Sequence, residues 1–253
     1  MIFIWNFCGF RPFMLPSHRI NGRNNSGKIS VFHRGNGVKK KKRIVDLKRS
    51  ILNVFGIVKR FEYDPKRSCF LALIFYYKLF LFSYILLPSG LRLGDSVISS
   101  IHLVFGLGNA CPLSSMCFGS PIHNIEICAG KGGQLIRAAG LKAFVLSKHY
   151  KLSRVKLNKK RIVILRNNVF ITIGQVSNLF HIYKNLRKGG ITRLMGFRPI
   201  VRGVAMNPID HPHGGGEGKT SGGRVSVSPW GKLTKGPKTR KGFFSLIKKE
   251  FVS

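Results

Sequence analysis

From Ile44 to Ile173 the apolar residues fall into short runs, each closed by turn-forming or charged residues. Runs of this length favour strands, because an amphipathic helix needs a longer repeat to bury one face. We therefore predict a mainly β protein with two small barrels. The expected strands lie at 44–47, 54–58, 71–77, 80–87 and 95–99 in the first barrel, and at 122–128, 141–147, 152–157, 161–165 and 169–173 in the second.

The most hydrophobic segment, residues 69–87, has the length of a marginal membrane helix. Its Ile, Phe and Tyr content, Lys78 near its centre and the turn formers on both sides favour a β-hairpin instead. Membrane association is the alternative. Further along, Val176, Leu179, Phe180, Tyr183 and Leu186 recur at helical spacing. They predict a short helix that packs on the core and ends at Gly189-Gly190.

The charge restricts the function more than the length does. The 253 residues include 44 Lys and Arg but only 8 Asp and Glu, which gives a net charge of +36. Such self-repulsion opposes compact folding unless a polyanion neutralises it. Between Glu126 and Asp210 there are seventeen Lys or Arg and no carboxylate. The chain therefore has little material for acid–base catalysis, and RNA is the expected partner.

Residues 207–223 carry too much glycine and proline for a helix or strand, so they predict an irregular loop. The three glycines Gly214, Gly215 and Gly216 would let another polymer approach the main chain closely, and many cations surround them. Residues 130–133 predict a second close-approach loop with one cation, Lys131, although a simple tight turn is the alternative.

Two other readings of the 207–223 loop are weak. Gly218-Lys219-Thr220 resembles the end of a phosphate-binding P-loop, but His213 stands where that pattern needs its first glycine. His211 and His213 flank a proline and have no cysteine nearby, so we predict no metal site. An RNA-acting enzyme with His211 as general base stays an alternative, although no paired acid or nucleophile is evident.

The five cysteines, Cys8, Cys69, Cys111, Cys117 and Cys128, lack the C-x-x-C spacing of a zinc ribbon. They are typical of reduced thiols, which argues against an oxidising compartment. Residues 1–20 resemble neither a transit peptide nor a secretory signal, so we expect a retained extension. Residues 21–43 are polar and basic, and we expect them to become ordered on RNA.

Several motifs together resemble large-subunit ribosomal protein two. The longest runs from Asp210 to Gly218, and the shorter ones include Arg198-Pro199, Val201 to Gly203, Ala205 to Pro208 and Pro229 to Gly231. Upstream, Gly22 to Gly27, His33 to Gly35, Glu62 to Pro65 and Gly130 to Gln134 follow in the family's order. The resemblance is continuous from about residue 22 to 240.

The resemblance implies an OB-like barrel followed by an SH3-like barrel. The expected division is a basic N-terminal extension at 1–43, the barrels at 44–100 and 107–195, and a Gly-rich basic extension at 196–253. It also implies a structural, non-catalytic role beside the peptidyl-transferase region. The implied partners are large-subunit rRNA, neighbouring ribosomal proteins, the small subunit and, indirectly, tRNA. No catalytic cofactor is expected, and any magnesium would accompany the rRNA.

We predict that RNA is contacted by basic, glycine, histidine and aromatic side chains of the two extensions and one barrel loop. These are Arg23, Arg34, Lys39, Lys40, Lys41, Lys42, Arg43, Lys131, Arg198, Arg202, His211, His213, Gly214, Gly215, Gly216, Lys219, Arg224, Trp230, Lys235, Lys238 and Arg240.

The compartment is predicted from composition and from the resemblance. Abundant Phe, Ile, Lys and Asn indicate an AT-rich coding genome. His33 to Gly35 together with Gly56 to Val58 resemble mitochondrial members of the family. We therefore expect a mitochondrial ribosome, with a plastid or a bacterial cytoplasm as the alternatives.

Overall fold

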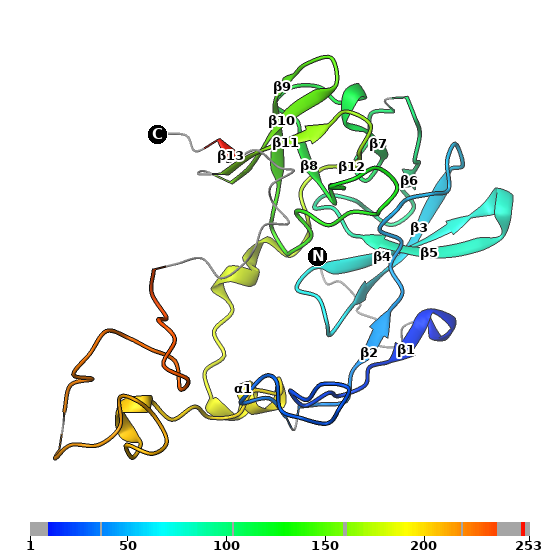
Figure 1. Ribbon diagram of the computed structural model, residues 1–253. Coiled ribbons are helices and arrows are strands. Elements are labelled where there is room, and N and C mark those ends of the chain that lie inside the picture. The colour runs from blue at the N-terminus through cyan, green and yellow to red at the C-terminus, as the bar shows by residue number, and fades with distance from the viewer. Residues whose placement is uncertain are drawn as a thin grey trace. The chain divides into compact units, whose positions relative to one another are not determined.

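The computed structural model describes residues 10–35, 37–102, 104–158, 161–218, 220–236 and 249–250 (Figure 1). The chain divides into two compact units. The barrel unit comprises Met1–Ser17, Lys39–Asn185 and Phe244–Ser253, and the extension unit comprises His18–Val38 and Leu186–Phe243. Two curled half-barrel sheets dominate the barrel unit, with few helices, which confirms the predicted mainly β fold with OB-like and SH3-like barrels.

The first sheet has four antiparallel strands in the order β5-β4-β3-β6. Its strands are β3 (Gly56–Tyr63), β4 (Phe70–Tyr76), β5 (Leu81–Leu86) and β6 (Ser96–Val97). Side chains of β4 alternate between two cores. Ala72 and Ile74 pack in one, while Leu71 and Leu73 pack in the other. Burial on both faces explains why this strand is a continuous apolar run.

The predicted hairpin over residues 69–87 is confirmed. β4 and β5 are its arms, drawn in cyan in Figure 1, and the 3-10 turn η2 (Tyr77–Leu79) joins them at Lys78. Phe80, which follows the turn, has a left-handed backbone with φ 51° and ψ 34°. Among the described residues, the structure contains no helix with the length and apolarity needed to cross a bilayer.

The second sheet has seven strands in the order β13-β11-β10-β9-β8-β12-β7. The strands are β7 (Ala110–Pro112), β8 (Pro121–His123), β9 (Ala143–Lys148), β10 (Leu152–Asn158), β11 (Arg161–Arg166), β12 (Phe170–Ile173) and β13 (Lys249–Glu250). Its core is made by buried aliphatic side chains such as Leu113, Ile122, Val155 and Ile171. The strands predicted at 152–157, 161–165 and 169–173 agree with β10, β11 and β12 to within one residue.

Polar contacts join the two sheets within the barrel unit. The Leu47 carbonyl accepts hydrogen bonds from the Gly133 amide at 2.8 Å and from the Asn124 side chain at 3.3 Å. On another edge, the Asn178 side chain donates to the Ser68 carbonyl at 2.7 Å. All of these residues lie in connections between strands, so the connections of the two sheets fix the barrels against each other.

Three predicted strands of the barrels are wrong in their limits. Residues 44–47 form no strand, because the pairing lies just before them, between β1 (Met14–Pro16) and β2 (Lys41–Arg43). The strand predicted at 122–128 ends as β8 at His123, because the chain turns there to bury Glu126. β3 starts at Gly56 and continues to Tyr63, past the predicted 54–58, because its second half pairs with β4.

The predicted helix at 176–186 is also wrong. Only the 3-10 turn η4 (Leu179–Tyr183) forms, after Asn178 takes a left-handed backbone with φ 64°. Of the expected apolar stripe, Val176 is buried, whereas Leu179, Phe180 and Tyr183 are exposed. Gly189-Gly190 opens the helix α1 (Gly189–Leu194) rather than ending one. The remaining short helices are η1 (Arg11–Phe13), η3 (Leu113–Ser115) and η5 (Gly203–Ala205).

Candidate nucleic-acid interface

The glycine-rich loop of the extension unit is closed by its own main chain. The Asn207 carbonyl accepts from the amides of Asp210 and His211 at 3.0 and 3.3 Å. The Met206 carbonyl accepts from the Gly215 amide at 3.0 Å, and the His211 carbonyl from the Gly214 amide at 2.8 Å. The described residues of the loop form no regular strand or helix, as predicted, and these bonds give them one defined path.

His211 is part of this internal framework. Its side chain is 9% exposed, and its Nδ1 accepts a hydrogen bond from the His213 amide at 3.0 Å. The ring packs directly on Gly203, where an added Cβ would come within 2.5 Å of Nδ1. His213 in turn accepts from the Val227 amide through Nε2 at 3.3 Å. Both imidazoles therefore hold backbone segments together.

The three consecutive glycines meet tight internal spacing. A Cβ on Gly214 would clash with the Asn207 carbonyl, and a Cβ on Gly215 would lie 2.6 Å from Pro208 Cγ. Gly215 and Gly216 have positive φ values of 89° and 95°, which side-chain-bearing residues rarely adopt. The loop's own closure thus requires glycine at these positions, independently of any approaching polymer.

The N-terminal loop packs against the start of the C-terminal extension within the extension unit. His33 Nδ1 lies 2.7 Å from the Pro199 carbonyl, and the Arg198 amide donates to the His33 carbonyl at 3.0 Å. The Arg34 guanidinium lies over the Phe197 ring, 4.1 Å from its centroid. Residues separated by more than 160 positions in the sequence therefore form one surface.

That surface contains a cationic hollow of about 380 Å³. Arg23, Arg34 and Arg198 line it together with Asn21, His33 and Phe32. All three arginines are exposed, and Phe32 also packs on Trp230 with ring centroids 5.7 Å apart. Guanidinium groups beside an aromatic ring provide the two contacts that RNA backbones and bases need.

The basic residues at 39–43 differ in their exposure to solvent. Lys39, Lys41 and Lys42 are exposed and Lys40 is half-buried. Arg43, in contrast, is 8% exposed, and its Nε lies 3.7 Å from Glu62 Oε2. The run therefore presents four lysines to a partner, while the Arg43 side chain is turned to a buried carboxylate.

The loop at 130–133 is held by Glu126, which sequence reasoning missed. The buried carboxylate accepts from the amides of Gly130, Gly132 and Phe170 at 3.1, 2.7 and 3.1 Å. The loop carries the exposed Lys131. Glu126 was the last carboxylate before a long basic stretch, and that isolation is the signal that could have identified it.

The remaining predicted contacts lie in the extension unit. Arg202, Arg224, Trp230 and Lys235 are exposed there, whereas Lys219, Lys238 and Arg240 fall outside the described residues. In the part of the chain that the structure describes, no three His, Cys, Asp or Glu side chains come together as a metal site. Cys69 and Cys111 are buried free thiols, and Cys117 and Cys128 are exposed ones.

The charges of the extension unit are one-sided. Its sequence holds sixteen Lys or Arg, four in 18–38 and twelve in 186–243, against the two carboxylates Asp210 and Glu217. Such a surface attracts a polyanion strongly at low salt. Among the described residues of this unit, no carboxylate lies within ion-pair distance of a histidine, lysine or arginine side chain. The excess of cations favours RNA binding.

Comparison with known proteins agrees with this geometry. Residues 12–99 match the family described as "Ribosomal Proteins L2, RNA binding N-terminal domain", and residues 106–231 match "Ribosomal Proteins L2, C-terminal domain". The large ribosomal subunit protein uL2m of Reclinomonas americana is 51% identical over 220 residues, which are 87% of this chain and 79% of the relative. The large ribosomal subunit protein uL2 of Orientia tsutsugamushi is 48% identical over 227 residues, which are 90% and 83%. The chain therefore belongs to the ribosomal protein L2 family.

Proposed function

We propose that this chain binds large-subunit rRNA through its extension unit, the lysines at 39–42 and the loop that carries Lys131. As an L2-family protein it is a structural component of the large ribosomal subunit and not an enzyme. The observation that supports this rRNA-binding surface is the excess of sixteen cations over two carboxylates in the extension unit. Each exposed cation can neutralise a phosphate and release a counterion.

Within this interface we assign different roles to different residues. Arg23, Arg34 and Arg198 contact phosphates or an unpaired base at the cationic hollow. Exposed Arg202, Arg224, Lys235 and Trp230 extend the contact along the chain, and Lys219, Lys238 and Arg240 are assigned to it from sequence. His211, His213 and the glycines 214–216 shape the loop that meets the RNA.

The alternative of an RNA-acting enzyme with His211 as general base is disfavoured by two contacts. Its Nδ1 already accepts the His213 amide, and its ring is buried against Gly203. A general base must reach the proton that it removes. We assign His211 a structural role.

We further propose that the 207–223 loop lies near the peptidyl-transferase region and supports subunit association, with tRNA affected indirectly. The neighbours would be other ribosomal proteins and the small subunit. Magnesium at this interface would be bound with rRNA phosphates, because a hard cation prefers oxygen ligands. A photo-crosslinking residue at Ile209, which is 91% exposed, tests the location. Crosslinks confined to rRNA distant from the peptidyl-transferase region would contradict it.

The compartment that we propose is the mitochondrion. The uL2m relative supports it, although the Orientia relative is a bacterial uL2. The proposed division into extensions at 1–43 and 196–253 and barrels at 44–100 and 107–195 places one RNA-binding extension at each end. Immunogold labelling of source cells tests the compartment. Label in a plastid or in the cytoplasm would refute it.

The rRNA assignment is tested by the salt dependence of binding. We expect log K to fall with log salt by about 0.7–0.9 for each phosphate contact, so the full chain should show a steep slope. Arg198→Gln and Arg202→Gln should each lower the slope by about one contact. The matched control is Lys184→Gln, which removes an exposed cation of the barrel unit that belongs to no proposed contact. Equal effects at Arg198 and Lys184 would contradict the assignment.

A further inference from the structure

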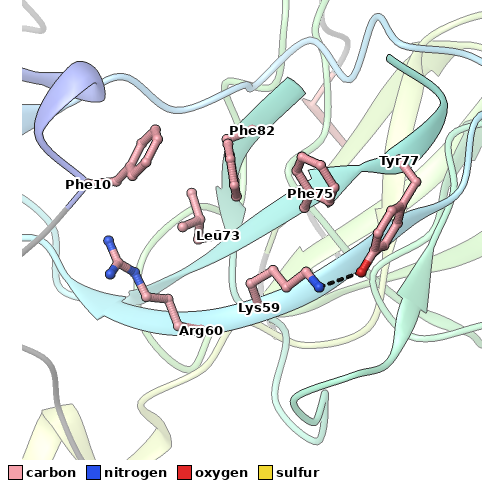
Figure 2. A pocket seen from close by; sticks show the side chains of 7 residues that line it. All are labelled: Phe10, Lys59, Arg60, Leu73, Phe75, Tyr77 and Phe82. Atoms are coloured by element: carbon pink, nitrogen blue, oxygen red, sulfur yellow. Dashed lines mark hydrogen bonds between the residues drawn. The ribbon is translucent and has the colours of Figure 1, made fainter. Parts of the chain in front are cut away.

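The face of the first sheet that packs in the core with Leu71 and Leu73 ends in an apolar hollow that the RNA-binding role does not use. The hollow measures about 520 Å³ and is lined by Phe10, Leu73, Phe75, Tyr77 and Phe82, with Lys59 and Arg60 along its lower side (Figure 2). All of these residues belong to the barrel unit. Figure 2 shows the three phenylalanines and Leu73 side by side above β3 and β4.

Strand register explains why these side chains share one face. Leu73, Phe75 and Tyr77 alternate along the chain with Ile74 and Tyr76, which pack in the core on the opposite face of the sheet. Phe75 of β4 pairs with Phe82 of the neighbouring strand β5, and their ring centroids are 4.7 Å apart. Phe82 in turn packs on Phe10 at 4.8 Å. The result is a row of aromatic rings across the sheet.

One end of this face is covered by the chain itself. The Phe10 amide donates to Tyr84 Oη at 3.0 Å and to Glu62 Oε1 at 3.3 Å, which fixes the N-terminal segment there. The other end is open. Tyr77 and Phe80 are 49% and 82% exposed, and Phe55, before β3, is 61% exposed. Contiguous exposed aromatic surface of this kind marks an interaction site more often than a solvated surface.

The charges at the hollow differ from those of the extension unit. Arg60 is paired with Glu62 at 2.6 Å. Lys59 donates to Tyr77 Oη at 2.5 Å and lies over the Tyr77 ring, 4.8 Å from its centroid. Among the described residues, the structure gives Lys59 no carboxylate partner within ion-pair distance. Glu62 is shared between Arg60 and Arg43, so the hollow has a small excess of positive charge. A small excess of charge beside an aromatic row suits a single carboxylate better than a polyphosphate chain.

We propose that this hollow and the adjoining hairpin tip are a docking site for another protein. The partner would insert apolar side chains against Phe75, Phe80 and Phe82, and a carboxylate of the partner would face Lys59. Aromatic residues with few charges are the composition of the buried centre of protein interfaces. The charge complementarity at Lys59 sets the orientation of the bound segment.

Photo-crosslinking in cells tests this site with the full chain. A benzoylphenylalanine at Phe80 should crosslink to one protein, and the crosslinked peptide should contain apolar residues and an Asp or Glu. The matched control is Tyr150, which is 93% exposed at the turn between β9 and β10 and should not crosslink to that peptide. A crosslink from position 80 to RNA, to lipid, to a second copy or to residues 1–9 would overturn the proposal.

Two substitutions then test the energetics. Phe80→Asn removes the ring, and Asn tolerates the left-handed backbone of this position, so the fold should persist. It should lower the crosslink yield from a probe at Phe55 by about tenfold, since interface aromatics commonly contribute that much. Lys59→Glu should lower it as well, and exchange of the partner's carboxylate for Lys should restore it. A yield unchanged by both substitutions, or one not restored by the charge exchange, would overturn the proposal. RNA that still copurifies in that case would leave the rRNA assignment intact.

Discussion

The Nδ1 atom of His211 lies 3.0 Å from the backbone nitrogen of His213 and accepts its hydrogen bond. This contact makes the imidazole a cap for the turn that leads into the three glycines. It also assigns the acceptor role to Nδ1, so in the neutral ring the proton is on Nε2. His211 therefore stabilises the loop from within, and substitutions should be judged by whether they supply an acceptor at the same place.

His211→Asn should retain loop structure better than His211→Leu. The Asn Oδ1 atom occupies the position of the imidazole Nδ1 and can accept the same amide, whereas Leu leaves that amide unpaired at a cost of about 1–3 kcal/mol. His211→Gln places its oxygen one bond further out and should be intermediate. We expect assembled Asn and Gln particles to retain peptidyl transfer. If particles of both variants assembled fully but formed no peptide bonds, the result would favour His211 as a general base.

Gly214→Ala should disrupt the loop before any RNA binds. Its Cβ would clash with the Asn207 carbonyl, which already holds two amides of the turn. Gly222→Ala is the control, because a Cβ there makes ordinary van der Waals contacts, with His213 ring atoms at 3.7 Å and the Arg224 carbonyl oxygen at 3.9 Å. Limited proteolysis of the free chain should cleave the 207–223 loop faster in the Gly214 variant alone. Equal cleavage, with an assembly defect only in the presence of rRNA, would assign the glycines to the RNA contact instead.

The strands could be predicted where burial imposes a pattern. The continuous apolar run of β4 follows from its burial between two cores. Lys78, which lies at the turn, is the residue that favoured a hairpin over a membrane helix. The family resemblance was likewise readable, because its motifs lie in glycine- and proline-rich loops where backbone geometry restricts the residue type. The match to the L2 family confirms it.

Long-range polar contacts could not be predicted in the same way. Arg34 stacks on Phe197, and Arg43 turns to Glu62, because of partners far away in sequence. No local pattern signals either contact. The apolar spacing at Leu179 to Tyr183 misled for a related reason, since a 3.6-residue repeat predicts burial only if another element packs on it.

Glu126→Gln should separate loop geometry from charge at Lys131. The amide offers one acceptor oxygen where the carboxylate serves three backbone amides, so we expect a loss of about 1–3 kcal/mol in the free energy of unfolding. RNA affinity should fall as well, because the loop that presents Lys131 loosens. Lys131→Ala should lower RNA affinity through the loss of the cation.

Exposed Glu217→Gln is the matched control for the same chemical change and should alter neither quantity. Thermal unfolding followed by circular dichroism, with filter binding to rRNA at fixed salt, measures both effects. A Glu126→Gln chain with wild-type stability would show that the three short contacts contribute nothing to the fold.

Acid should destabilise the barrel unit through His123. Its side chain is fully buried, and Nδ1 donates to the Gly174 carbonyl at 2.9 Å. Burial lowers the pKa of His123 from 6.5 to about 4, while the Gly174 contact partly opposes this shift and nearby Arg49 adds to it. The folded chain thus binds the proton less readily than the unfolded chain.

The sign of the pH dependence follows from this difference. Above about pH 6.5 neither state is protonated at His123 and its contribution to stability is complete. As the pH falls from 6.5 towards 4, only the unfolded state takes up the proton, so stability should fall by about 1.4 kcal/mol per pH unit, or about 3 kcal/mol in all. His123→Asn keeps a donor for the Gly174 carbonyl but does not titrate. Urea unfolding of both chains across this pH range, followed by far-UV circular dichroism, measures the free energy of unfolding. Its dependence on pH should be shallower for the Asn variant. A cavity left by the substitution would lower the stability equally at every pH, so it would not change this slope. Parallel slopes would mean that the buried imidazole binds its proton equally well in the folded and unfolded chains.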